Sequence, residues 1–98
     1  MKVFLSQPMN GLTDEEIILK RNDISSRLHE LLDTEEDIEI LDSFFTDYNG
    51  NGVQFLGKSI LLMGEADIVV FMDGWEKVRG CRLEELIAKE YFMARVYE

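Results

Sequence analysis

A turn near the end of the chain collects several residue types that can bind or transform a ligand. In "FMDGWEKVRGCRLEE", residues 71–85, an apolar run ends at Asp73, and Glu84 follows near the start of a helical segment. Gly74 and Gly80 permit close approach of the backbone to a ligand, while Trp75 supplies a wide apolar face. Either the turn holds a ligand and Glu84 does chemistry, or Glu84 only complements the helix dipole. The residues alone favour the second explanation.

A second candidate is the loop "SQPMNGL", residues 6–12. It precedes a helix, and free backbone N–H groups at a helix start suit a phosphate, a carboxylate or sugar hydroxyls. The competing explanation is a tight turn built on Pro8 and Gly11. The loop has no lysine and matches no glycine-rich phosphate-binding motif.

No metal or cofactor is expected. "DYNGNG", residues 47–52, copies the first half of an EF-hand calcium loop, but Lys58 stands where a bidentate glutamate is required. His29 has no second histidine or cysteine near it, and Cys81 is the single cysteine, which removes a cysteine-based zinc site. The neighbouring aromatic residues Phe44 and Phe45 are able to stack on a base, although aromatic residues at loop roots are more often core.

The elements that must position these residues alternate along the chain. Apolar runs predict strands at residues 2–6, 38–42 and 67–72, and a last edge strand within 94–98. Helical spacing predicts helices at residues 14–32, opened by a Thr13–Glu16 capping box, at 53–66, and from Gly80 onward. This order indicates an α/β fold with a small parallel sheet and right-handed crossovers. Ligands of such sheets bind beyond the carboxyl ends of the strands, which selects the loops 6–12, 43–52 and 73–80.

Length and charge limit the remaining possibilities. The 98 residues fit a single domain, and 46% are hydrophobic, as expected for a packed globule. Asp and Glu number 20 against 10 Lys and Arg, and the net charge of −10 disfavours nucleic-acid binding. No apolar run resembles a signal peptide or a membrane span, so we expect a cytoplasmic protein without a membrane partner.

Three motifs in this order resemble the nucleoside 2-deoxyribosyltransferase-like family. They are "KVFLSQPMNGL" at the start, "ADIVVFMDGW" in the middle, and Gly80-x-x-x-Glu84 followed by Ala88. The chain is most similar to short members of undefined function that are common in phages. The resemblance covers nearly the whole chain, 1–98, except for the middle loop. It implies a three-layer α/β sandwich of flavodoxin or Rossmann type and a homo-oligomer.

The resemblance also implies roles for individual residues. Glu84 would be the nucleophile that attacks the anomeric carbon of a nucleoside or nucleotide. The loop after the first strand would contact that substrate through Ser6, Gln7, Met9, Asn10 and Gly11. Cleavage of the N-glycosidic bond then passes through a covalent glycosyl-enzyme. Asp73 would assist departure of the base if it lies roughly 5–5.5 Å from Glu84. Trp75 or a middle-loop aromatic would stack on the base, and Arg79 would hold a phosphate.

The chain departs from the family pattern at one telling position. Val78 stands two residues before Gly80, where active members carry a polar residue. This motivates a second hypothesis, a non-catalytic module that keeps the fold and binds a nucleotide. A third hypothesis, an acidic interaction domain, is favoured by the net charge of −10.

Overall fold

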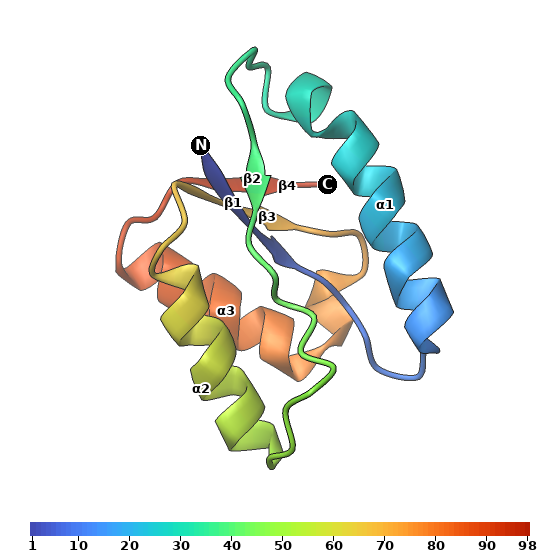
Figure 1. Cartoon of the computed structure of the whole chain (residues 1–98). Helices are drawn as coiled ribbons and strands as arrows, with labels where there is room; N and C mark the ends of the chain where they lie inside the picture. Colours follow the sequence, from blue (N-terminus) through green and yellow to red (C-terminus); the bar gives the residue numbers. More distant parts are fainter.

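Four short strands form one fully parallel sheet, and helices connect them in the order that the sequence predicts (Figure 1). The structure is a computed structural model that describes all residues from Met1 to Glu98. The elements are β1 (Lys2–Ser6), α1 (Asp14–Leu31), β2 (Glu39–Ile40), α2 (Gly52–Met63), β3 (Ile68–Phe71), the 3₁₀ turn η1 (Trp75–Lys77), α3 (Arg79–Glu90) and β4 (Arg95–Tyr97).

The strand order is β2-β1-β3-β4, so the chain reverses its direction of travel across the sheet between β1 and β3. β1 pairs along its length with β3, from Val3 opposite Ile68 to Ser6 opposite Phe71. In an open parallel sheet, the crevice beyond the carboxyl ends of two such strands is the usual ligand position. This topology therefore directs attention to the loops that follow Ser6 and Phe71.

The helices cover both faces of the sheet and make three layers (Figure 1). Helix α1 contributes Ile24 and Leu28 to a core cluster on one face. Helices α2 and α3 contribute Met63 and Ala88 to the cluster on the opposite face. Alternate residues of β1 and β3 point into the two clusters, which is why both strands are continuously apolar. The predicted α/β three-layer architecture is confirmed.

Most predicted elements are confirmed, with shifts at their ends. Thr13 and Glu16 form the predicted capping box, with hydrogen bonds of 3.1 and 3.2 Å. The predicted edge strand is β4, whereas β2 has only two residues instead of five. Helix α2 stops at Met63 rather than residue 66, with Gly64 as its C-cap. No helix of the chain has the length and apolar character needed to cross a membrane.

Candidate functional site

A cavity of about 430 Å³ opens at the carboxyl ends of the strands, where the topology places a ligand. Its size lies within the range of small-molecule pockets, roughly 300–1,000 Å³. The wall is mostly apolar, with a few polar groups from the loops after β1 and β2 and from α3. The lining residues are Phe4, Leu5, Gln7, Met9, Asn10, Ile17, Ser43, Phe44, Phe45, Gly52, Phe55, Leu56, Ser59, Val78, Gly80, Cys81 and Glu84.

Glu84 supplies the single carboxyl group in the wall of this cavity. Its side chain is only 7% exposed, and Oε1 accepts a hydrogen bond of 2.7 Å from the Ser6 hydroxyl. Glu84 shares the buried stripe of α3 with Cys81 and Ala88, at the spacing of a helix face. It is the sixth residue of α3, beyond the first turn, so complementing the helix dipole does not explain it.

Burial raises the pKa of Glu84 to about 7, and the hydrogen bond from Ser6 opposes this rise. A carboxyl group in an apolar wall loses the hydration that stabilises its charged form. Such a group exchanges its proton near neutral pH, as nucleophiles and general acid–base groups of enzymes do. Burial also raises the pKa of the Cys81 thiol to about 11, so this neighbour is uncharged at pH 7.

Arg21 hydrogen-bonds to the loops after β1 and β2, which both contribute to the cavity wall, although Arg21 does not line the cavity itself. Its guanidinium donates to Gln7 Oε1 at 2.8 Å, to the Leu41 carbonyl at 3.0 Å and to Ser43 Oγ at 2.8 Å. Gln7 also donates from Nε2 to the Ile17 carbonyl at 2.9 Å. Burial lowers the pKa of Arg21, which has no carboxylate partner within salt-bridge distance. The loops after β1 and β2 are thus joined through one half-buried cation.

Sequence reasoning missed Arg21, although a signal is present. Ile17, Arg21, Ile24 and Leu28 follow the three- and four-residue spacing of a helix face, and the three apolar members are buried. A charged residue inside an apolar stripe needs buried polar partners. This interruption of the stripe therefore pointed to a polar network beneath α1.

The residues of the loop after β1 have different roles: some line the cavity, and others build the turn. Gln7, Met9 and Asn10 line the cavity, as predicted for ligand-contacting residues. Ser6 lies beneath the wall, 1% exposed, and contacts Glu84 instead. Gly11 is exposed and has a φ of 77°, a backbone conformation that favours glycine, so its role is the turn.

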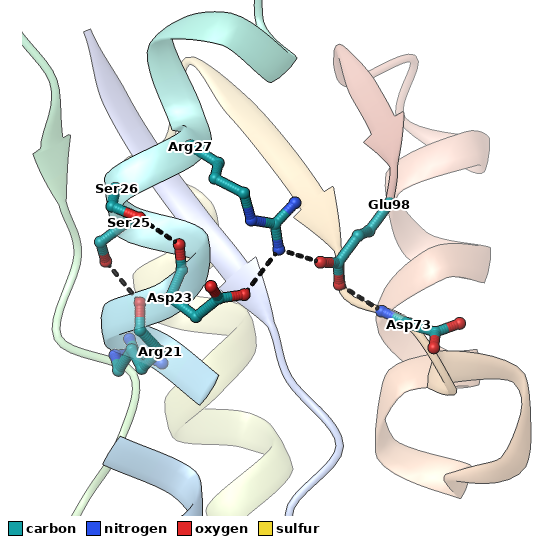
Figure 2. Close-up of polar contacts among 7 residues, drawn as sticks. All are labelled: Arg21, Asp23, Ser25, Ser26, Arg27, Asp73 and Glu98. Carbon is teal, nitrogen blue, oxygen red and sulfur yellow. Dashed lines mark hydrogen bonds and ion pairs between the residues drawn. The ribbon is translucent and has the colours of Figure 1, made fainter. Parts of the chain in front are cut away.

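Asp73 does not reach the cavity. Its side chain is exposed, and its backbone N–H donates to Glu98 Oε1 at 2.7 Å. Figure 2 shows this contact as part of a surface network, in which Arg27 bonds Glu98 and Asp23 and the Asp73 carboxylate points away. The structure thus does not bring the two predicted carboxyl groups together in one cavity.

Of the other residues predicted to bind a ligand in the β3–α3 turn, only Gly80 lines the cavity. Trp75 packs against Phe71 and Tyr97, with ring centroids 5.5 Å away in each case, and so extends the core. Gly74 has a φ of 89° and makes the turn, and the exposed Arg79 does not line the cavity. Gly80 does line it, and an added Cβ there would meet no heavy atom within 4 Å. Glycine at this position leaves room beside Glu84.

Aromatic side chains of the middle loop and α2 form part of the cavity wall. Phe44 and Phe45 line the cavity together with Phe55, which sequence reasoning did not single out. Lys58 does not line the cavity, and its ammonium lies 4.9 Å from the Phe45 ring centroid, within cation–π distance. A cavity lined by aromatic side chains and one carboxyl group suits a flat ring joined to a polar group.

Comparison of the chain with protein-family models, with curated proteins and with solved structures finds no match.

Proposed function

We propose that this protein cleaves or transfers the N-glycosidic bond of a nucleoside or nucleotide, with Glu84 as the nucleophile. The observation that carries the proposal is a buried carboxyl group in the wall of a small-molecule cavity at the β1–β3 crevice. The resemblance of the Gly80-x-x-x-Glu84 segment to nucleoside 2-deoxyribosyltransferase-like proteins supports the same residue.

The chemistry requires a carboxylate near the anomeric carbon and space for a base. Glu84 provides the first, and its pKa of about 7 leaves a large ionised fraction at neutral pH. The aromatic wall of Phe44, Phe45 and Phe55 provides an apolar surface for the base. Because Asp73 is exposed and does not line the cavity, solvent water rather than Asp73 delivers the proton to the departing base.

The direct test measures release of free base. Purified protein is incubated with each deoxynucleoside and each deoxynucleoside monophosphate, and products are separated by liquid chromatography. We expect release by the wild type and none by Glu84→Gln, with Glu90→Gln, an exposed change on the same helix, as the matched control. Activity that persisted in Glu84→Gln would exclude Glu84 as the nucleophile.

A second candidate function is a non-catalytic nucleotide-binding module, and Val78 favours it. Val78 lines the cavity beside Gly80, so the position where active members carry a polar residue is apolar here. A binder is stabilised by a ligand that it never consumes. Thermal unfolding with each nucleoside and nucleotide, followed by recovery of intact ligand, distinguishes the two functions.

We also propose a homo-oligomer, as the resemblance implies. Val53 and Leu61 on α2 are 80% and 79% exposed, which supports burial against another subunit. Light scattering coupled to size-exclusion chromatography tests this directly, and a mass of 11.4 kDa at all concentrations would contradict it.

A further inference from the structure

The two oxygens of the Glu84 carboxyl group have different surroundings. Oε1 accepts the hydrogen bond from Ser6, while Oε2 has no hydrogen-bond partner in the protein. The one fully enclosed side-chain nitrogen or oxygen without a partner is Arg95 Nε. Oε2 therefore keeps some accessible surface and an unused acceptor site, on a residue that lines the cavity.

Ser6 is held rigidly beneath this carboxyl group. It is the last residue of β1, 1% exposed, and its carbonyl accepts a hydrogen bond of 3.0 Å from the N–H of Met72, the residue that follows β3. A serine hydroxyl carries one proton, and donation to a carboxylate is the strongest use of it. Cys81 lies close enough to interact with both Ser6 and Glu84. Because Ser6 does not line the cavity, it acts on a ligand only through Glu84.

We propose that Ser6 is a positioning residue that holds Oε1 of Glu84, so that Oε2 is the atom that bonds the anomeric carbon. This inference rests on the proposed function. In the first step, Oε2 donates an electron pair to the anomeric carbon, and the carbon–nitrogen bond breaks with its electrons leaving on the base. The base takes a proton from a water molecule, and the hydroxide that remains adds its oxygen to the anomeric carbon as the bond to Oε2 breaks, which restores the carboxylate and releases the sugar.

The electrostatics of the cavity make this contact the main support for the ionised carboxylate. No Lys, Arg or His side chain lines the cavity, and the other titratable group there is the Cys81 thiol. That thiol stays neutral at pH 7 because burial raises its pKa to about 11. Loss of the Ser6 hydroxyl therefore removes the one group that lowers the pKa of Glu84.

The test compares Ser6→Ala with Ser43→Ala. Both remove the hydroxyl of a buried serine at the same end of the sheet, but Ser43 bonds Arg21 and the Leu5 carbonyl and not Glu84. The Glu84 carboxyl titration is followed by ¹³C NMR, with Glu84→Gln identifying the resonance. We expect Ser6→Ala to raise the Glu84 pKa above about 7 and Ser43→Ala to leave it unchanged. An unchanged or lower value in Ser6→Ala overturns the inference.

Kinetics supply the second readout. Ser6→Ala is expected to lower kcat for base release about tenfold or more, with KM nearly unchanged and the pH profile moved to higher pH. Ser6→Thr, which keeps the hydroxyl, should restore the titration and guards against a misfolded alanine variant. Equal kcat and pH profiles in Ser6→Ala and wild type would contradict the positioning role.

The titration needs no substrate, so the two proposals fail separately. A raised Glu84 pKa in Ser6→Ala, without base release by any variant, supports the Ser6 contact and contradicts glycosidic cleavage. Base release that depends on Glu84 but is indifferent to Ser6 supports the function and contradicts the positioning role.

Discussion

Replacement of Glu84 by glutamine should change how the stability of the protein depends on pH. Burial raises the pKa of Glu84 from its ordinary value of 4.5 to about 7 in the folded state. The folded state therefore retains a proton between these values that the unfolded chain has lost. The contribution of Glu84 to the stability of the fold is therefore fully present below pH 4.5, declines as the pH rises, and is lost once the pH passes about 7.

The size of the effect follows from the pKa difference. At about 1.4 kcal/mol for each pH unit, the rise from 4.5 to about 7 corresponds to about 3 kcal/mol of unfolding free energy. Glutamine keeps the shape of the side chain and an acceptor for the Ser6 hydroxyl, but it never ionises. The free energy of unfolding of Glu84→Gln, relative to that of the wild type, should thus rise by about 3 kcal/mol as the pH is raised from 4.5 to 8.

Urea unfolding of both proteins, followed by circular dichroism across this pH range, measures the difference. Glu90→Gln removes the same charge from the exposed face of α3 and reports the effect of net charge alone. A wild-type minus Glu84→Gln difference that stays flat across the range would refute the assignment of Glu84 as a buried, proton-exchanging carboxyl group.

Activity against pH, the backbone strain at Phe92 and the hydrogen bonds of Arg21 give three further predictions. If base release requires ionised Glu84, kcat/KM should rise with pH through about 7 and then level off, and a rate that falls over this range would contradict the nucleophile. Phe92 is 91% exposed with a φ of 55°, so Phe92→Gly should raise the free energy of unfolding by about 1 kcal/mol in urea titrations, whereas a loss would mean that the ring makes stabilising contacts. Arg21→Ala should cost about 2–3 kcal/mol because it leaves buried acceptors without a donor. Arg27→Ala removes a solvent-exposed arginine and should cost clearly less in the same assay, and equal costs would contradict the polar network at Arg21.

The fold was predictable because its determinants are local or periodic. The apolar runs of β1 and β3, the capping box at Thr13 and the order of the elements are readable from neighbouring residues. The length of β2 is shorter than the sequence predicts, two residues instead of five. Unlike the residues of β1 and β3, those of β2 are not buried. Ile38 packs against the core but lies outside the strand.

The site was harder to predict because spacing does not reveal which way a side chain points. The residues alone favour a helix-dipole role for Glu84, and only the resemblance of the Gly80-x-x-x-Glu84 segment to a known family singles it out. Its position on one helix face with Cys81 and Ala88 is a sign of burial that the sequence already carries. Asp73 follows a strand end, yet the turn that begins at Gly74 directs its side chain to solvent. The contact of Ser6 with Glu84 joins residues 78 positions apart and depends on tertiary packing alone.

The most direct measurement of the central claim is the mass of the protein during reaction. Wild-type protein is mixed with a deoxynucleoside, quenched in acid and digested, and the peptides are examined by mass spectrometry. The proposed mechanism predicts one added deoxyribosyl group on the peptide that contains Glu84, and none in Glu84→Gln. Base release without any such adduct, or an adduct on a different residue, would contradict Glu84 as the nucleophile.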